Sequence, residues 1–413
     1  MEKLFLLTKC WMINRSNYSS QETHHFLRRM ISIVGVFLLL CSFYAGIDAK
    51  TSPATVRSES NIKTIKNPDT PLKATIIPKL TIVLKIEPGQ YTQIDLTLIS
   101  DAFKDTNGNI YLLDGKNCRI HKFNASGKYQ TSFLSRGTGP GELNQYPSIF
   151  INQNSLYAHG FNDKKIIRFD LEGKLLSEKK FLRLYRNPII ISDAQFIACE
   201  TIESTENPIK RIGLYSLDTE KLENVFMDSK ARGRLFIPFG KSRTAVEPEV
   251  GIIPDTMISV DLQARKCYIA LNNEYKIYRK DFSGNTEIII KKGFQPIELS
   301  NEDKNSVISN FGDVPAEAKA ILLKVLPDKM CAFRGIDILS GGYLAVERFS
   351  DYGKHVLDIF DENGRFVYVF QPPEIKGLKV FKIFRDKLIA IVEEEDSDIY
   401  IEYRIDNLPK ELF

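Results

Sequence analysis

An internal repeat is the feature that most constrains how this chain of 413 residues can fold. Three residues of the first copy return 46 residues later in the second copy: Tyr111 as Tyr157, Phe123 as Phe169 and Gly127 as Gly173. Four later copies are less regular and contain, in chain order, Phe196, Tyr268, Gly342 and Lys387. A repeat of this length is typical of proteins built from stacked, similar supersecondary units.

Every copy has the same order of elements, which predicts one four-stranded antiparallel sheet. An apolar strand, a short polar turn, a β-rich strand and a variable loop are followed by a third strand, a Gly-containing hairpin turn and a fourth strand. The glycine of that turn, for example Gly127, supplies the positive φ that a tight hairpin needs. Because a lone sheet cannot cover both of its faces, successive sheets are expected to stack radially and close into a ring. The sequence therefore predicts an all-β fold, a six-bladed β-propeller of four-stranded antiparallel blades, in which the strand Leu80–Ile86 completes the last blade.

Residues 301–326, between the fourth and fifth copies, depart from the repeat. Pro315 is followed there by good helix formers, which predicts a short helical insertion between blades four and five. Its apolar positions favour packing on the propeller rim as a structural decoration, with a lid or a partner surface as the alternative. The expected domains are an export signal or membrane anchor at 1–49, a linker at 50–77 and the propeller at 78–413.

The N-terminal region carries a targeting pattern. Residues 30–47 are an uncharged stretch of 18 residues directly after Arg28 and Arg29, which is typical of an export signal. As a helix this stretch would span about 27 Å, just short of a bilayer core of about 30 Å, so an uncleaved anchor stays open. The run 38–42 resembles a bacterial lipobox, in which Cys41 would be lipidated. We expect an exported protein in the periplasm, on the outer surface or at the membrane through its segment near 28–49.

The first repeat resembles a known family. Gly108-Asn109-Ile110-Tyr111 is followed by Asp114, Asn117 and Arg119-Ile120. This order resembles the NHL repeat, whose hallmark is Gly-Asn-Ile-Tyr followed by Asp-x-x-Asn-x-Arg-Ile. The stretch 136–143 resembles the loop between blades of the same family, and residues of roughly 78–413 are similar to six-bladed propeller proteins of bacterial cell envelopes. The resemblance implies a fold and not one particular activity.

Binding residues are expected on one face of the ring. The loops that join the second and third strands, and those that lead from one blade to the next, share a face around the central channel. The candidate ligand-binding residues in these loops are Asp114, Asn117, Arg119, Arg136, Glu142, His159, Asp163, Arg232, Arg234 and Arg243. The last three could attract an anionic ligand or a saccharide, with a solvated loop as the alternative. Arg119 is also expected to satisfy carbonyl groups between blades.

Little in the sequence points to catalysis. There are five histidines and no recognisable metal-ligand spacing, nucleophile elbow or phosphate loop. His121 is expected at an exposed strand position rather than as a ligand. No catalytic residue, metal ligand or cofactor is predicted, although a calcium site built from Asp, Glu and Asn stays open. The cysteines after the leader, Cys118, Cys199, Cys267 and Cys331, are expected to be buried free thiols, with disulfides open for an exported chain.

These observations favour a binding or interaction module that recognises a protein or a glycan through the loop face of the propeller. The alternative is a divalent-cation-dependent hydrolase or lyase of the lactonase type. The two are separated by whether three or more carboxylate or amide side chains from different blades converge on the axis. The formal net charge of +4 is too small to favour nucleic acid as a partner, and we expect a monomer.

Overall fold

The computed structural model describes residues 62–412, apart from 93, 95, 97, 145–146, 153, 203–208, 231–234, 240–241, 247–252, 310–315, 350–354 and 395–396. The expected export signal and Cys41 lie outside these residues. In the described part of the chain, no helix is long and apolar enough to cross a membrane.

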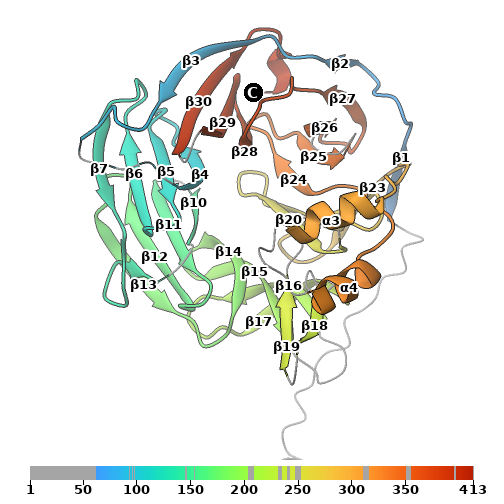
Figure 1. Ribbon diagram of the computed structural model, residues 1–413, viewed down its shortest axis with the longest axis horizontal. Helices are drawn as coiled ribbons and strands as arrows, with labels where there is room; N and C mark the ends of the chain where they lie inside the picture. The colour runs from blue at the N-terminus through green and yellow to red at the C-terminus, as the bar shows by residue number, and fades with distance from the viewer. Residues whose placement is uncertain are drawn as a thin grey trace, which may run out of the picture. The chain divides into compact units, whose positions relative to one another are not determined.

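Six antiparallel sheets are arranged around one axis as the blades of a propeller (Figure 1). Their strands are given from the innermost to the outermost. Blade 1 contains β4 (Ile99–Lys104), β5 (Ile110–Asp114), β6 (Arg119–Phe123) and β7 (Tyr129–Phe133). Blade 2 contains β10 (Ser148–Asn152), β11 (Ser155–Gly160), β12 (Lys165–Asp170) and β13 (Leu175–Lys180). Blade 3 contains β14 (Tyr185–Ser192), β15 (Gln195–Ile202), β16 (Ile209–Ser216) and β17 (Leu222–Ser229).

The second half of the ring continues the pattern. Blade 4 contains β20 (Thr256–Asp261), β21 (Lys266–Leu271), β22 (Lys276–Asp281) and β23 (Thr286–Lys292). Blade 5 contains β24 (Gly335–Ile338), β25 (Leu344–Phe349), β26 (His355–Phe360) and β27 (Phe366–Phe370). Blade 6 contains β28 (Leu378–Phe384), β29 (Lys387–Glu394), β30 (Ser397–Ile405) and β3 (Leu80–Ile86). The predicted fold class is confirmed.

The strand predicted to close the ring does so. β3 pairs antiparallel with β30, with Leu80 opposite Ile405 and Ile86 opposite Tyr400. It is the outer strand of blade 6, although it precedes blade 1 in the chain. The two ends of the propeller are therefore held in one sheet, and the ring cannot open without breaking that sheet.

The segment expected to be a linker at 50–77 needs correction in its second half. β1 (Lys63–Asn67) pairs in parallel with β23, and β2 (Ala74–Ile76) pairs in parallel with β27, so blades 4 and 5 each gain a fifth strand. Figure 1 shows this N-terminal segment, in blue, running around the outside of blades 4, 5 and 6. An outer strand leaves a row of unpaired backbone groups, and the added strands cover them.

The core lies between neighbouring blades. All residues of β5 and of β27 are buried. Because each blade packs between two others, its middle strands have no solvent face and read as continuous apolar runs. The same packing corrects the expectation for His121, which is buried on β6 with its Nδ1 atom 2.7 Å from the hydroxyl of Ser132.

The hairpin-turn glycines have two structural roles. Gly127 and Gly173 have φ values of 83° and 89°, as the turn requires. Both also touch the outer strand of the preceding blade: a Cβ atom on Gly127 would lie 2.6 Å from Leu84, and one on Gly173 would lie 2.5 Å from Phe133. The repeated glycine therefore sets the distance between blades as well as the turn.

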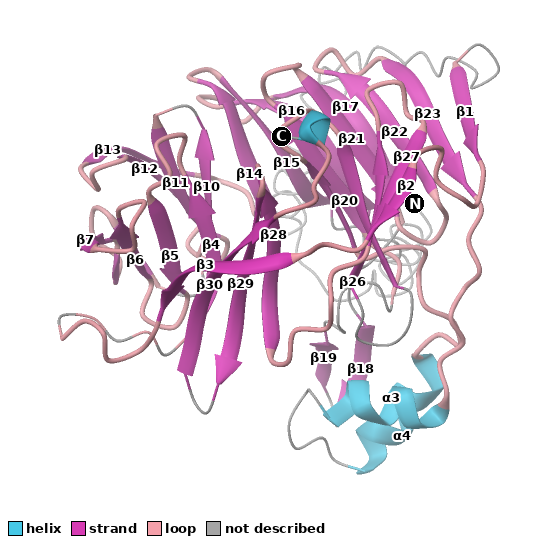
Figure 2. Ribbon diagram, turned by 90° about the horizontal axis from the view of Figure 1, so that it is seen from above, coloured by secondary structure: helices cyan, strands magenta, loops and turns pink. Residues whose placement is uncertain are grey.

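The connection between blades 4 and 5 contains α3 (Asn301–Ser309) and α4 (Ala316–Val325), which confirms the helical insertion. Ser300 and Asp303 cap α3 reciprocally, because the Ser300 hydroxyl accepts from the backbone N–H of Asp303 and the Asp303 carboxylate accepts from that of Ser300. The connection between blades 3 and 4 contains the hairpin β18 (Leu235–Phe239) and β19 (Ser242–Val246). Figure 2 shows these helices and this hairpin together beyond one face of the blades.

The helical insertion has a small apolar core of its own. Val307 of α3 and Leu322 of α4 pack with Met330 and with Ile253, which precedes blade 4. This cluster is separate from the clusters between the blades. The insertion is therefore a helical pair joined to the propeller rim, and it is larger than the single helix that the sequence indicated.

The four cysteines in the described residues are free thiols, as expected. Cys118, Cys267 and Cys331 are buried, and Cys199 is half-buried. Burial raises the pKa of the Cys267 thiol to about 12 and that of Cys331 to about 11. Thiols that stay protonated in apolar surroundings are unreactive, so these side chains act as small core residues.

Candidate functional site

The propeller has two distinct faces. The loops between second and third strands and the connections between blades open on one face, which we call the loop face. The Gly-containing hairpin turns and the turns between first and second strands lie on the opposite face, which we call the hairpin face. Helices α3 and α4 belong to the loop face (Figure 2).

Asp114, Asn117 and Arg119 lie in or beside the loop from β5 to β6. The buried carboxylate of Asp114 accepts hydrogen bonds from the backbone N–H of Asn117 at 2.9 Å and from its side-chain amide at 2.7 Å. These bonds fix the loop and leave little of Asp114 for a ligand. Arg119 is exposed, and its guanidinium donates no hydrogen bond to a described residue, so the expected contact with carbonyl groups between blades is not found.

Arg136 and Glu142 lie in the connection from blade 1 to blade 2, where β8 (Ser135–Arg136) and β9 (Glu142–Leu143) form a short parallel pair. Arg136 is exposed and donates from Nε to the carbonyl of Asn144 at 3.1 Å. Glu142 accepts from the backbone N–H of Gly139 at 2.8 Å. The Glu142 carboxylate therefore holds the conformation of its own loop, whereas the rest of the Arg136 guanidinium is exposed to solvent.

His159 and Asp163 lie where β11 runs into the loop face of blade 2. His159 is 2% exposed, and burial lowers its pKa to about 4 although Asp163 opposes that shift. Its Nε2 atom has no hydrogen-bond partner among the described residues. Asp163 accepts from the backbone and the side-chain amide of Asn144, at 3.0 Å and 2.5 Å. Neither side chain is presented as a surface ligand.

The basic group near blade 4 is not placed. Arg232 and Arg234 lie outside the described residues, and Arg243 lies on β19 with its side chain outside them. The prediction of an anion or saccharide site at these three residues stays a prediction.

The structure brings together a set of polar residues that the sequence did not single out. We call Asp101, Ser259, Asp337 and Lys382 the channel cluster, because each lies on the innermost strand of a different blade (Figure 1). The Lys382 ammonium contacts the Asp101 carboxylate at 2.5 Å and lies 3.5 Å from the centre of the Phe103 ring. The Asp337 carboxylate accepts from the backbone N–H of Ile338 at 2.8 Å, and the nearby Ser259 hydroxyl acts to lower the pKa of this carboxyl.

Asp337 is the most exposed member of the channel cluster. Its side chain is open to water in the channel, but the inner strands around the channel limit its solvation. This desolvation raises the pKa of the Asp337 carboxyl, although its hydrogen bonds and the positive charge of Lys382 act to lower it. Raised pKa values combined with specific charged neighbours are more frequent at functional sites than elsewhere. The channel cluster is therefore a candidate for contact with a bound group that offers both donors and acceptors.

A second cluster, the rim triad, lies on the loop face of blade 5. It contains Arg334, Glu347 and His355. The Glu347 carboxylate accepts from Arg334 at 2.6 Å and from Nδ1 of His355 at 2.5 Å, while Nε2 of His355 is 3.1 Å from Arg334. Burial alone would raise the pKa of Glu347, but the hydrogen bonds from His355 and Arg334 outweigh burial and lower it. Both ring nitrogens of His355 contact other members of the triad, so neither is available as a catalytic base, and the triad is better explained as a structural link.

A pocket of 470 Å³, the loop-face pocket, lies beside the rim triad between blades 4 and 5. Lys292 and Arg348 line it, and both pair with the fully buried carboxylate of Asp358, at 3.1 Å and 2.9 Å. Asp358 also accepts from the hydroxyl of Tyr275 at 2.8 Å. The segment leading to α3, from Gly293 to Ile297, forms one wall of the pocket. The two cations of the lining therefore share one buried carboxylate behind it, and Asp69 supplies an acidic group to the lining itself.

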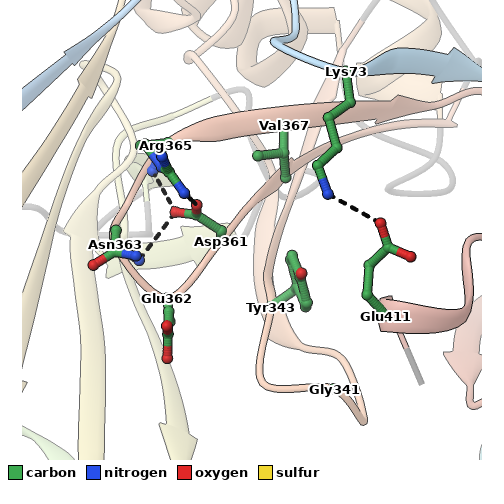
Figure 3. Close-up of a pocket in the computed structure, with 9 residues that line it drawn as sticks. All are labelled: Lys73, Gly341, Tyr343, Asp361, Glu362, Asn363, Arg365, Val367 and Glu411. Atoms are coloured by element: carbon green, nitrogen blue, oxygen red, sulfur yellow. Dashed lines mark hydrogen bonds and ion pairs between the residues drawn. The ribbon is translucent and has the colours of Figure 1, made fainter.

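A further pocket, the hairpin-face pocket, has a volume of 380 Å³ and lies on blade 5. Figure 3 shows Asp361, Asn363 and Arg365 on one side of it and Lys73 and Glu411 on the other, with Tyr343 and Val367 between them. Lys73 and Glu411 form an ion pair at 3.0 Å. Glu411 lies in the C-terminal 3₁₀ turn, Lys410–Leu412. Residues from both ends of the propeller therefore line this pocket.

Strand position was the only sequence signal for the channel cluster. Asp337 and Lys382 each stand between two apolar residues of a first strand, and Asp101 stands between Ser100 and Ala102 in another. A charged residue inside the innermost strand of a blade indicates a side chain that faces the channel, and this rule could have selected all three. The pockets carry no such signal, because their walls come from segments far apart in the chain.

The described residues contain no group of three or more His, Cys, Asp or Glu side chains that could hold a metal ion. On the axis itself, two carboxylates from different blades, Asp101 and Asp337, share their surroundings with Lys382. A lysine ammonium among the carboxylates competes with a cation for the same oxygen atoms. The arrangement that would favour the hydrolase or lyase alternative is not found in this part of the chain.

Comparison with known proteins supports the fold. Residues 94–236 match a family model described as a six-bladed β-propeller. No curated protein matches the sequence of this chain. Among solved structures, a protein of Bacteroides fragilis described as exported superposes with a TM-score of 0.52 and 14% sequence identity, and the match covers 84% of this chain and 100% of that one.

Two further solved structures are more distant. A protein of Bacteroides vulgatus has a TM-score of 0.48 and 10% identity over 80% of this chain and 99% of that one. The virginiamycin B lyase of Staphylococcus aureus has a TM-score of 0.39 and 12% identity over 79% of this chain and 99% of that one. At these identities the similarity concerns the fold, and the chain is a six-bladed β-propeller.

Proposed function

We propose that this six-bladed propeller is an exported binding module that recognises a protein or glycan partner through its loop face. The observation that carries the proposal is the convergence of the channel cluster, in which charged and hydroxyl groups from four blades meet at the axis and Asp337 remains open to water. Such a set can bind a polar group of a partner through several directed hydrogen bonds at once.

A protein partner fits the loop face better than a small free molecule. The rim triad and the loop-face pocket lie on the same face as α3, α4 and the hairpin β18–β19 (Figure 2). Loops and insertions on a rigid scaffold are the usual place for recognition, and here they extend the surface well beyond the channel mouth.

Export is part of the proposal and rests on residues 28–49, whose pattern is that of a signal or anchor. The fold similarity to a protein of Bacteroides fragilis that is described as exported is in keeping with it. Fractionation of cells that produce the full chain tests this part separately. Recovery of the chain in the cytoplasmic fraction, with its N-terminal segment intact, would contradict export.

The loop-face proposal is tested by site-specific photo-crosslinking in cells. A photoreactive residue replaces Gln295, which is exposed in the lining of the loop-face pocket, and in a matched variant it replaces Ser283, which is exposed on the hairpin face of the same blade. Position 295 is expected to give a discrete crosslinked product that position 283 does not give. Equal products from both positions, or a product from 283 alone, would place the partner elsewhere.

A further inference from the structure

We propose that the hairpin-face pocket is a second binding site and that it takes an uncharged saccharide. It lies on the face opposite to the one that the proposed function uses, so neither proposal depends on the other. The pocket is assembled from the segment before β2, the turn from β24 to β25, the turn from β26 to β27 and the C-terminal 3₁₀ turn. Its volume of 380 Å³ is at the lower end of the range of about 300–1,000 Å³ that is usual for small-ligand sites.

One wall is held rigidly by a carboxylate. Asp361 accepts from the backbone N–H groups of Asn363 at 3.0 Å and Arg365 at 2.9 Å, and from Nε of Arg365 at 2.7 Å. These bonds fix the turn and hold the Arg365 guanidinium in one position. A site whose groups are fixed before binding loses less entropy when the ligand arrives.

The opposite wall is fixed as well. Glu411 accepts from the hydroxyl of Tyr368 at 2.6 Å and from Lys73 at 3.0 Å. The bonds from Tyr368 and Lys73, together with a backbone bond, lower the pKa of Glu411 to about 2. The ion pair with Lys73 is therefore present at neutral pH. The C-terminal turn can pack closely against Gly341 only because this residue has no side chain: a Cβ atom there would lie 2.6 Å from the carbonyl oxygen of Glu411.

Three polar groups of the pocket remain available. The Glu362 carboxylate, the Asn363 amide and the Tyr343 hydroxyl have no hydrogen-bond partner among the described residues. Together they offer acceptors and donors, and a sugar hydroxyl can act as either. The ring of Tyr343, between the two walls in Figure 3, offers an apolar surface for the C–H face of a pyranose.

The charges of the pocket select against other ligands. Of its two cations and three carboxylates, Lys73 pairs with Glu411 and Arg365 pairs with Asp361, which leaves the exposed Glu362. An anion would meet a net negative lining. A simple cation would find one exposed carboxylate, which contributes little binding free energy. An apolar ligand would strip water from polar groups without replacing their hydrogen bonds.

The test is a titration of the purified full chain with neutral monosaccharides and disaccharides, followed by calorimetry and by saturation-transfer NMR. Uronic acids and free amino acids serve as ligands of the wrong charge. The variants are Asn363→Ala and Glu362→Ala, both at exposed positions. Ser283→Ala is the matched control, because Ser283 occupies the same turn position in blade 4 as Asn363 in blade 5.

At least one neutral saccharide is expected to bind, and each pocket variant is expected to weaken that binding about 5-fold, the effect of one lost hydrogen bond. Ser283→Ala should leave binding unchanged, and all three variants should unfold at the wild-type temperature. Absence of binding by every neutral saccharide, preference for the charged ligands, or equal loss in the control would each overturn the proposal. Crosslinking from position 295 should be unaffected by Asn363→Ala, so failure here is separable from failure of the loop-face proposal.

Discussion

The ammonium group of Lys104 and the carboxylate of Glu402 form an ion pair that is buried where the ring closes. Lys104 ends the inner strand of blade 1, and Glu402 lies on β30 of blade 6. Their side chains are 3% and 0% exposed. Glu402 also accepts from Lys387 at 2.7 Å and from the hydroxyl of Tyr400 at 2.6 Å. The closing seam therefore contains a buried polar network, as does the interface between blades 4 and 5 around Asp358.

Removing the charge of Glu402 should destabilise the whole propeller. Burial alone would raise the pKa of Glu402, but its hydrogen bonds from Lys104, Lys387 and Tyr400 outweigh burial and lower it, so the carboxylate is ionised in the fold. Glu402→Gln leaves Lys104 buried without its counter-charge, and we expect a loss of about 3–5 kcal/mol in the free energy of unfolding. Urea unfolding followed by circular dichroism measures it.

The double variant Lys104→Met with Glu402→Gln is the control for this reasoning. It removes both charges and keeps an amide oxygen that can accept from Tyr400 and Lys387. The free energy of unfolding should return most of the way to the wild-type value, because the cost lies in the uncompensated charge. Equal loss in the single and double variants would show that the cost comes from altered packing instead.

The close packing between blades predicts that alanine substitution destabilises the protein by different amounts at two glycines with the same turn geometry. Gly173 and Gly284 have φ values of 89° and 83°. A Cβ atom on Gly173 would lie 2.5 Å from the ring of Phe133, whereas one on Gly284 would lie 3.5 Å from its nearest neighbour, the carbonyl oxygen of Val225. Gly284→Ala should cost about 1–2 kcal/mol for the left-handed conformation alone. Gly173→Ala should cost about 1–3 kcal/mol more, because Phe133 must move.

Thermal unfolding of the two variants side by side measures this difference. The comparison cancels the backbone contribution, since both alanines must adopt the same positive φ. If the two variants unfold at the same temperature, the glycine of the repeat serves the turn alone, and the packing role assigned to it is wrong.

The ring itself could be predicted from the sequence because its signals are local. Each blade carries its own apolar strands and hairpin glycine, and Leu80–Ile86 was an unpaired apolar strand upstream of six copies, so its place in blade 6 followed. The strands β1 and β2 carry no such pattern. Lys63–Asn67 alternates polar and apolar residues weakly, and it becomes a strand because the free edge of β23 offers it a partner.

The candidate site was harder to predict for the same reason. Asp114 and Glu142 were selected from loop position, but they use their oxygen atoms to hold their own loops. Asp101 and Lys382 were passed over because they stand inside strands, and they meet between the neighbouring inner strands of blades 1 and 6 only when the ring closes. A site whose residues come from blades far apart in the chain depends on how the ring closes, so a local sequence pattern does not predict it.

Asn67, in the N-terminal segment, links blades 4 and 5, and replacing it should lower the free energy of unfolding of the whole propeller. Its amide donates to the carbonyl oxygens of Gly364 on blade 5, at 2.9 Å, and Lys291 on blade 4, at 3.2 Å. Its own oxygen accepts from the backbone N–H of Phe366 at 2.7 Å. At roughly 0.5–1.5 kcal/mol for each bond, Asn67→Ala should cost about 2–3 kcal/mol.

Lys66→Ala is the matched control for Asn67→Ala, because Lys66 is exposed on the same strand and contributes its backbone to the sheet. It should leave the unfolding midpoint in urea within the error of the wild type. Hydrogen exchange at β1 and β2 gives a second readout. Faster exchange in the Asn67 variant alone would assign the effect to the link between the blades.

The buried imidazole of His159 predicts how stability depends on pH. Burial lowers its pKa to about 4 in the fold, with Asp163 opposing the shift, while an exposed histidine of the unfolded chain has a pKa of about 6.5. Between these values the unfolded state binds the proton and the folded state does not. The free energy of unfolding therefore falls as the pH falls from about 6.5 to about 4, by about 3 kcal/mol from this residue.

His159→Phe removes the titrating group and keeps an aromatic ring beside Phe181, whose centroid lies 6.4 Å from that of His159. The variant should show a smaller loss of stability between pH 7 and pH 4 than the wild type, by about 3 kcal/mol. Acidic residues with lowered pKa values, such as Glu347 and Glu402, lose their contributions at lower pH in both proteins, so they cancel in the difference. Urea unfolding at a series of pH values gives the two curves. Parallel curves over this range would mean that His159 is protonated in the folded state and that its Nε2 atom has a partner after all.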